Sequence, residues 1–387
     1  MSATTLRPAE AAARSCVDFN VRGIVGVRLI DACESDAAAV TAQIGPVQGT
    51  IHGAADIEIT FVDHLHVPPL TNVERGHSGF SPEGYYIRQT LPFRAAARLE
   101  IGDDRFAITC ERGAEAIPLL IGLVCVSALR QGFVPLHASA FHFRGHDALL
   151  TGWSKGGKTE ALLAFARHGA EYIGDEWILL SADGRRCAGI PEPIRLWDWQ
   201  IEQIPGLHAR ISRSAAVRMR AVRHMDSLFR RVTRDGSRVP RQADKAMSML
   251  NQQRNVRIAP SVLFGDAQRS EGSPSKLFVL ASRDLPATEV FPADAGLVRE
   301  QMLATTMHEL SPVLGEYRAY RYAFPQRRCA LMENLPASME SLLSTALRGM
   351  ECFHVLHPYP VDFSELFAAM AGAFDGTGSA AMTRLNL

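Results

Sequence analysis

Residues 148–159 read ALLTGWSKGGKT, and this stretch decides the fold that we expect. ALLT (148–151) is typical of a short buried strand, and EALLAFARH (160–168) has the periodicity of an amphipathic helix. Between them, GWSKGGKT (152–159) matches the pattern G-x-x-x-x-G-K-[ST]. Glycines let successive backbone N–H groups converge on a phosphate, and the positive end of the following helix points at the same place. The stretch therefore predicts a phosphate-binding loop.

The residue types in this loop each have a place in nucleotide binding. We expect Lys158 to reach the β- and γ-phosphates and the Thr159 hydroxyl to hold Mg²⁺. The chain has only four Lys against 37 Arg, so two lysines three residues apart stand out. A glycine-rich turn without a ligand is the alternative, but the strand before the loop and the helix after it favour binding. The predicted nucleotide-binding residues are Gly152, Ser154, Lys155, Gly156, Gly157, Lys158 and Thr159.

An acidic pair follows one short helix later. EYIG (171–174) is typical of a strand, and it ends in Asp175 and Glu176, 16 residues after Thr159. A right-handed strand–helix–strand unit would lay 171–174 parallel to 148–151 and bring both carboxylates towards the γ-phosphate. A carboxylate there can bind Mg²⁺ or accept a proton. We predict that Asp175 is a metal ligand and that Asp175 and Glu176 are catalytic; an acidic surface turn is the alternative.

A histidine lies at the start of the preceding hairpin. LHASAFHF (136–143) is strand-like, and RGHD (144–147) is a turn. If 137–143 pairs with 148–151, His137 lies near residues 152–154, where it can orient a carboxylate or contact phosphate. A buried histidine with a purely structural role remains the alternative.

The whole stretch from 136 to 180 resembles the nucleotide-binding core of HPr kinase/phosphorylase and its HPr-kinase-like serine kinase relatives. That family has a fold similar to phosphoenolpyruvate carboxykinase, and it has the same order of histidine, phosphate loop and acidic pair. The resemblance implies an α/β fold with this type of P-loop core. It also implies that Lys158 and Thr159 bind the triphosphate and Mg²⁺, that Asp175 deprotonates an acceptor hydroxyl, and that His137 assists. Members often assemble into hexamers, so a homo-oligomer is a possible state.

The sequence also departs from that family at three places. Glu176 stands where the family usually has a second Asp, and Trp153 stands where the bifunctional enzymes usually have Asp. GIPEPIRLWDWQ (189–200) replaces the motif E-x-R-G-L-G. These differences point away from HPr as the acceptor and from phosphorolysis. They favour the shorter serine-kinase-like relatives.

The sequence patterns divide the chain into three parts, and the second of them contains an insertion. We expect an N-terminal α+β domain at 1–130, a nucleotide-binding domain at 131–375 with an Arg-rich insertion at about 207–257, and a frayed tail at 376–387. In the first part, the pattern predicts a helix at 34–44, a loop at 67–84, a hairpin at 97–110 and an apolar helix at 116–130. In the second, it predicts strands at 276–282 and 317–324 and helices at 294–310 and 362–374.

The Arg-rich insertion has 12 Arg and one Lys against three Asp. It has one aromatic residue, Phe229, and so lacks a stacking platform for nucleic acid. We favour a solvated, partly disordered insertion over a surface that binds an acidic partner or nucleic acid. Arg195, Arg254 and Arg257 are candidate phosphate clamps. We expect Trp197 and Trp199 to fill the core rather than to stack on an adenine.

Composition excludes several classes of protein. Lys plus Arg and Asp plus Glu are 41 each, which argues against a chain-wide basic coat for nucleic acid and leaves a local basic patch open. The most apolar run, 117–129, is too short to span a bilayer, and the N-terminus has no apolar core of a secretory signal. Seven scattered cysteines without a C-x-x-C pair fit a reducing compartment. We therefore predict a cytoplasmic protein without a membrane partner.

Together these patterns predict an ATP-dependent kinase that uses Mg²⁺. It would transfer the γ-phosphoryl group of a nucleoside triphosphate to a serine-type hydroxyl of a peptide, protein or small molecule. Two alternatives stay open. One is a regulatory or interaction protein that uses ATP as a switch without transfer, and the other is plain ATP hydrolysis.

Overall fold

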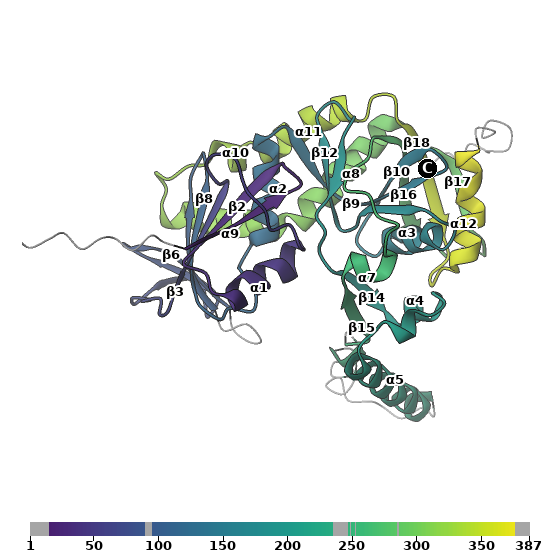
Figure 1. Cartoon of the computed structure of the whole chain (residues 1–387), viewed down its shortest axis with the longest axis horizontal. Coiled ribbons are helices and arrows are strands. Elements are labelled where there is room, and N and C mark those ends of the chain that lie inside the picture. The colour runs from purple at the N-terminus through teal and green to yellow at the C-terminus, as the bar shows by residue number, and fades with distance from the viewer. Residues whose placement is uncertain are drawn as a thin grey trace, which may run out of the picture.

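The computed structural model describes residues 15–89, 95–234, 247, 249–251, 253–284 and 286–375. This part of the chain contains both helices and strands, and the sheets contain both parallel and antiparallel pairs (Figure 1). The predicted α/β class is therefore confirmed. The expected frayed tail at 376–387 lies outside the described residues.

The N-terminal sheet has eight strands in the order β1-β2-β3-β8-β7-β6-β5-β4. Its strands are β1 Cys16–Val21, β2 Val25–Ile30, β3 Ile57–Val62, β4 Thr71–Glu74, β5 Ser78–Ser81, β6 Gly84–Gln89, β7 Ala95–Ile101 and β8 Phe106–Glu111. In β2, β3 and β8, buried residues alternate with half-buried ones, which is the period of a strand with one face on a core. The predicted hairpin at 97–110 is confirmed as β7 and β8.

The central sheet positions the candidate site. Its order is β13-β12-β9-β10-β16-β18-β17, and β11 pairs with β9 beside this path. The strands are β9 Phe133–Phe143, β10 His146–Thr151, β11 Glu171–Gly174, β12 Trp177–Ser181, β13 Cys187–Gly189, β16 Pro274–Ser282, β17 Glu289–Pro292 and β18 Glu351–His357. β10, β16 and β18 are parallel neighbours, whereas β9 is antiparallel to both β10 and β11. β11 thus runs parallel to β10 as predicted, but with β9 between them.

Both faces of the central sheet are covered, which explains its almost continuous apolar strands. Leu149 and Leu277 belong to a core shared with the N-terminal sheet. Their neighbours Leu150 and Phe278 belong to a second core on the opposite face. The second core contains Phe165, which stacks on Phe141 at 4.6 Å between ring centroids.

The helices fill the space around these sheets. They are α1 Glu34–Ile44, α2 Leu120–Arg130, α3 Lys158–Ala166, α4 Asp198–Glu202, α5 Arg213–Arg234, α7 Pro260–Phe264, α8 Ala295–Glu309, α9 Ser311–Ala323, α10 Ala330–Glu333, α11 Leu335–Ala346 and α12 Phe363–Ala371. Within the part of the chain described here, none of them has both the length and the apolar character needed to cross a membrane.

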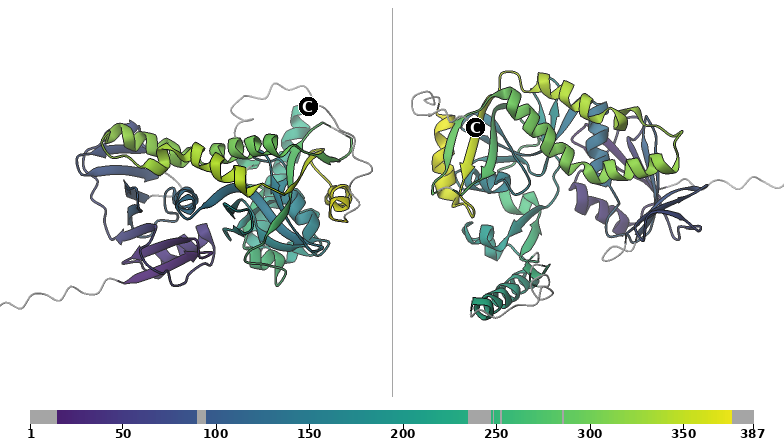
Figure 2. Two further views of the ribbon diagram at one scale, coloured as in Figure 1. Left: turned by 90° about the horizontal axis from the view of Figure 1, so that it is seen from above. Right: turned by 180° about the vertical axis from the view of Figure 1, so that it is seen from behind.

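Helices α8, α9 and α11 connect the central sheet with the N-terminal sheet, and Figure 2 shows them running across both. The Tyr85 hydroxyl of β6 donates a hydrogen bond to Glu316 of α9 at 2.6 Å. The Tyr85 ring also meets Tyr320 of α9 edge to face. One continuous apolar core therefore extends from the N-terminal strands to the strands of the central sheet.

A separate arm extends from the central sheet (Figure 1). It contains the two-stranded sheet of β14 Ile194–Trp197 and β15 Asn255–Ile258, together with α4 and α5. The predicted Arg-rich insertion falls in this arm, and its described part includes the 22 residues of α5. Residues 235–246, 248 and 252 of the insertion lie outside the described residues.

Most of the predicted elements are confirmed, including the helices at 34–44 and 294–310 and the strand at 276–282. Two predictions are wrong. The expected loop at 67–84 contains β4 and β5, and the expected strand at 317–324 lies in α9. In α9, Val313, Tyr317 and Tyr320 are buried, which is a helical spacing rather than an alternation.

Candidate functional site

The glycine-rich loop joins β10 to α3. Gly152 and Gly157 have φ values of +143° and +102°, in the region that favours glycine. A Cβ atom on Gly152 would lie 2.2 Å from the Leu280 carbonyl oxygen of β16. A Cβ atom on Gly157 would lie 2.2 Å from His357 Nε2, at the end of β18. The loop therefore needs glycine at both positions, because neighbouring parallel strands press against it.

Lys158 begins α3, and its ammonium group folds back over the loop. Its Nζ donates hydrogen bonds to the carbonyl oxygens of Gly152 at 3.0 Å and Trp153 at 3.1 Å. The residue is only 6% exposed, and this burial lowers the pKa of Lys158, although the carboxylates of Glu176 and Asp175 oppose the change. Lys158 thus offers a fixed cation at the N-terminal end of α3, where the helix dipole is also positive.

Thr159 and Asp175 meet at the base of the loop. The Thr159 hydroxyl lies 3.1 Å from Asp175 Oδ2, and it donates a hydrogen bond to that carboxylate. Ser139 of β9 donates a second hydrogen bond to Asp175 Oδ1. Asp175 itself is 2% exposed. The crossover from β10 through α3 to β11 therefore brings the carboxylate to the loop, as the sequence spacing predicts.

The two neighbouring carboxylates differ in proton affinity. Burial and the charge of Glu176 raise the pKa of Asp175 to about 7. Burial also acts on Glu176, but the hydrogen bond from His137 and the charge of Lys158 outweigh it and hold the pKa of Glu176 below its usual range. Two adjacent acids with pKa values pushed apart can take different roles, one binding a proton near neutral pH and the other remaining charged.

The raised pKa of Asp175 has a consequence for stability. A carboxyl group that holds its proton more tightly in the folded state stabilises that state below its unfolded pKa of about 4, and the contribution is lost as the pH rises through about 7. Without nucleotide or divalent cations, we expect Asp175→Asn to gain stability relative to the parent protein between pH 5 and pH 8. The gain should be on the order of a few kcal/mol in urea unfolding. A difference that does not change with pH would contradict this prediction.

His137 lies beside the acidic pair. Its Nε2 lies 3.2 Å from Glu176 Oε2, and its Nδ1 lies 3.4 Å from Glu309 Oε1 at the end of α8. Glu176 has a φ of +64°, which is strained for a residue with a side chain. In this backbone conformation its carboxylate is in contact with His137. His137 is buried at 5% exposed. The structure thus brings all three predicted catalytic residues, His137, Asp175 and Glu176, to one end of the loop.

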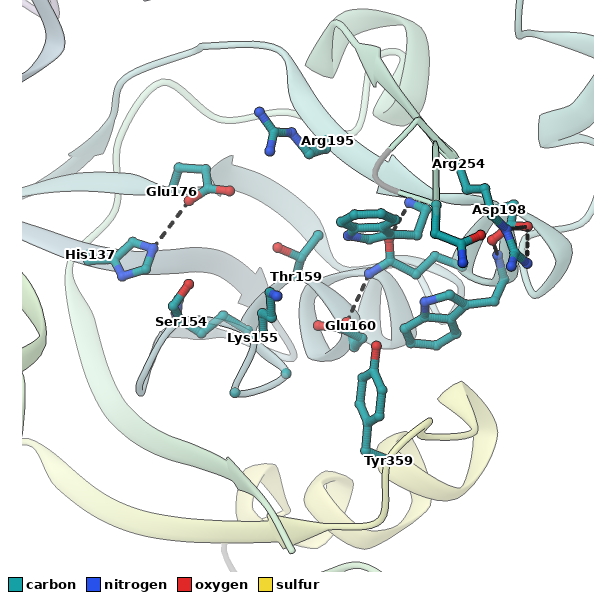
Figure 3. A pocket seen from close by; sticks show the side chains of 17 residues that line it. His137, Ser154, Lys155, Thr159, Glu160, Glu176, Arg195, Asp198, Arg254 and Tyr359 are labelled. Atoms are coloured by element: carbon teal, nitrogen blue, oxygen red, sulfur yellow. Dashed lines mark hydrogen bonds and ion pairs between the residues drawn. The ribbon is translucent and has the colours of Figure 1, made fainter. Parts of the chain in front are cut away.

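A cavity of about 450 Å³ opens in front of the loop. Figure 3 shows His137 and Glu176 at one end, Thr159 and Glu160 in the middle, and Tyr359 and Arg254 at the other end. Of the predicted nucleotide-binding residues, Ser154 to Thr159 line this cavity, whereas Gly152 lies behind them and accepts a hydrogen bond from Lys158. The volume lies within the range of small-molecule sites, roughly 300–1,000 Å³.

The candidate arginine clamps have different surroundings. Arg195 of β14 lines the cavity. Arg254 also lines it, but its guanidinium is paired with Asp198 at 2.6 Å. Arg257 is exposed on β15 and is not among the residues of the cavity wall. The sequence pattern alone does not indicate which of the three arginines lies in the cavity wall.

The expectation that Trp197 and Trp199 fill the core is correct only in part, since Trp199 packs against the second core. Both side chains are half-buried and line the cavity, because β14 ends and α4 begins at its rim. A sequence signal for this existed in the alternation of IRLWDW, which puts Arg195, Trp197 and Trp199 at every second position.

Other residues of the site are not predicted from the sequence. Ser139 is a small residue in an apolar strand, and Glu309 is far away in the sequence. His357 Nε2 donates to the Gly156 carbonyl oxygen at 2.9 Å, and the Thr305 hydroxyl donates to the Gly152 carbonyl oxygen at 3.2 Å. These residues support the loop from β18 and α8.

Comparison of this sequence with models of known protein families and with curated proteins finds no match. The chemistry of the site must therefore be argued from its own residues. A buried cation, a neighbouring hydroxyl and two carboxylates around a glycine-rich loop can bind a phosphate chain, hold a hard cation and accept a proton.

Proposed function

We propose that this chain is an ATP-dependent kinase with a P-loop core of the HPr kinase and phosphoenolpyruvate carboxykinase type. It transfers the γ-phosphoryl group to a serine-type hydroxyl of a peptide, protein or small molecule in the cytoplasm. The observation that carries the proposal is the 3.1 Å contact between the Thr159 hydroxyl and the Asp175 carboxylate at the base of the glycine-rich loop. The ammonium group of Lys158 lies over the same loop, 3.0 Å from the Gly152 carbonyl oxygen. A hydroxyl that can hold Mg²⁺ and a carboxylate that binds a proton near pH 7 would then both serve the same γ-phosphate.

The transfer step follows from these positions. The acceptor oxygen attacks the γ-phosphorus in line, and the bond between that phosphorus and the oxygen that bridges to the β-phosphate breaks. The nucleoside diphosphate leaves with the electron pair of that bond. The acceptor's proton passes to the Asp175 carboxylate, while Lys158 and the loop amides stabilise the charge on the phosphoryl oxygens.

The donor set fits Mg²⁺. The Thr159 hydroxyl and the Asp175 carboxylate are hard oxygen ligands, and they already lie side by side. When bound there, Mg²⁺ would neutralise charge on the β- and γ-phosphate oxygens. Ser139 holds the Asp175 carboxylate in place, and His137 holds Glu176, so that the site keeps one proton-accepting and one charged carboxylate.

Lys158→Ala tests the proposal. We expect at least about 10-fold weaker binding of ATP in the presence of magnesium, because a charge-assisted hydrogen bond to phosphate is lost. Calorimetry measures the binding, and transfer of label from γ-labelled ATP to an acceptor in cell extract measures the activity. Arg185→Ala, which removes an exposed cation from the turn after β12, is the matched control and should change neither.

Three other outcomes would change the conclusion. If the parent protein takes up no nucleoside triphosphate with magnesium, the proposal fails. If it binds ATP but labels no acceptor and releases no phosphate, ATP acts as a switch. If label appears only as inorganic phosphate, the chain is a hydrolase.

A further inference from the structure

The end of the cavity far from His137 is lined by aromatic rings. Trp197 ends β14, Trp199 lies in the first turn of α4, and Tyr359 follows β18. The rings of Trp199 and Tyr359 meet edge to face, with 5.9 Å between centroids and 81° between planes. Tyr359 is nevertheless 61% exposed, so much of its ring borders the open cavity (Figure 3). An aromatic wall of this kind offers π faces to a flat, aromatic ligand.

Hydrogen bonds hold this wall rigidly against the phosphate-loop helix. Gln200 Nε2 donates to Glu160 Oε1 of α3 at 2.9 Å, and Gln200 Oε1 accepts from the Trp197 backbone N–H at 2.7 Å. Asp198 accepts from Arg254 at 2.8 Å. The polar groups of Gln200, Asp198 and Arg254 are thus engaged with each other or with α3. The segment that carries Trp197 and Trp199 is thus preorganised relative to the loop.

Asn251 lines the same cavity and has one free polar atom among the contacts described. Its Nδ2 donates to Asp226 Oδ1 of α5 at 2.9 Å. A carboxylate of this kind accepts hydrogen bonds, so this contact fixes the amide with its carbonyl oxygen turned away from Asp226. Among the residues that the structure describes, that oxygen, Oδ1, has no hydrogen-bond partner, and almost none of its surface is open to solvent, so a base reaches it only when the side chains that cover it move aside. A buried acceptor without a partner is unfavourable unless a ligand supplies a donor.

We propose that this end of the cavity is a nucleobase subsite for adenine. The base stacks on the aromatic wall of Trp197, Trp199 and Tyr359, and its 6-amino group donates a hydrogen bond to Asn251 Oδ1. The inference rests on the proposed function, in which the 152–159 loop holds the triphosphate of the same nucleotide. Thr159 and Glu160 lie between the two ends of the cavity, so one nucleotide can extend from the wall to the acidic pair (Figure 3).

The choice of adenine follows from the direction of this hydrogen bond. At position 6, adenine carries an amino donor, whereas guanine and hypoxanthine carry a keto acceptor. A keto oxygen facing Asn251 Oδ1 would leave both acceptors without a donor and would repel. Sites that hydrogen-bond a particular group discriminate against ligands that lack it because a buried polar atom is then left unpaired.

Binding of four probes tests the subsite: ATP, ITP, GTP and inorganic tripolyphosphate, each with magnesium. For the parent protein, we expect ATP to bind about 10-fold more tightly than ITP or GTP. Asn251→Ala should weaken ATP binding by about 10-fold and bring the ratio of ATP to ITP affinity close to one. Asn251→Ala should leave the affinity for tripolyphosphate unchanged, because tripolyphosphate has no base.

Tyr359→Ala tests the aromatic wall without disturbing a buried core. We expect ATP and ITP to lose affinity together, by about 10-fold, while tripolyphosphate binding is unchanged. Tyr359→Phe keeps the ring and should restore most of the loss. Tyr322→Ala removes a tyrosine of similar exposure, 71%, from α9 and is the matched control. Circular dichroism and the melting temperature report whether each variant folds.

The outcomes separate this inference from the proposed function. If Lys158→Ala loses both ATP and tripolyphosphate while Asn251→Ala and Tyr359→Ala bind ATP normally, the triphosphate site stands and the adenine subsite is overturned. An ATP to ITP ratio near one in the parent protein also overturns it. If the parent protein binds neither ATP nor tripolyphosphate, the proposed function fails first, and the base subsite fails with it.

Discussion

Asp175→Asn is expected to reduce phosphoryl transfer by about 10²–10⁴-fold, the contribution typical of a general base. The amide is nearly the same size as the carboxylate and can still accept from Ser139 and Thr159, so the loop should keep its shape. It cannot take up the acceptor's proton. We therefore expect a large loss in the rate of transfer with a much smaller change in ATP affinity.

Rapid-quench transfer from γ-labelled ATP, together with calorimetric binding, separates the two effects. Asp183→Asn, in the exposed turn after β12, is the matched control and should transfer normally. A variant at position 175 that transfers at the parent rate would remove Asp175 from the mechanism. Loss of binding and transfer to the same degree would instead assign Asp175 to holding the nucleotide.

Gly157→Ala is expected to destabilise the protein by roughly 2–5 kcal/mol and to weaken ATP binding at least about 10-fold. The added Cβ atom would lie 2.2 Å from His357 Nε2, and the backbone φ of +102° is strained for any residue with a side chain. His357 also contacts the Gly156 carbonyl oxygen, so its displacement would move the loop. Urea unfolding and calorimetry measure the two losses.

Gly53→Ala is the control that separates backbone strain from the steric clash with His357 in Gly157→Ala. Gly53 has a similar φ of +96°, but a Cβ atom there would meet nothing within 4 Å. We expect this variant to lose about 1–2 kcal/mol from backbone strain alone and to bind ATP normally. Equal destabilisation of the two variants would mean that the contact between the loop and His357 contributes little.

The part of the fold around the loop could be predicted from the sequence because it depends on local patterns. Gly152, Gly157 and Lys158 belong to one short motif, and the 16 residues from Thr159 to Asp175 leave room only for a helix and a return strand. The alternation of 136–143 likewise predicts a strand, and its pairing with β10 places His137 near the loop.

Other elements could not be predicted because their residues fit two periods. YRAYRYAF (317–324) is rich in aromatic residues, which favours a strand, yet Tyr317 and Tyr320 are three residues apart and are both buried in α9. The loop signals at 67–84 are real, since Gly76 has a positive φ, but β4 and β5 pair on either side of that turn. In both cases, contacts with other elements decide the structure.

The remaining parts of the site depend on residues distant in the sequence. Glu309 and Thr305 come from α8, Tyr359 follows β18, and Asn251 lies in the Arg-rich segment. The spacing of residues within one motif cannot predict these contacts, because they depend on the order of the strands in the sheet. The segment expected to be a solvated insertion contributes Asn251 and Arg254 to the cavity wall for this reason.

The helices that join the two sheets bear on how the chain can be dissected. Cutting the gene between codons 130 and 131 would remove Tyr85, the partner of Glu316 and Tyr320, and would leave the apolar side of α9 facing water. Helix α9 follows directly after α8, and α8 ends at Glu309, which contacts His137. Loss of packing on α9 would therefore disturb the helix next to His137. The N-terminal domain is therefore an integral support of the domain that contains the glycine-rich loop, and the two should melt as a single cooperative unit.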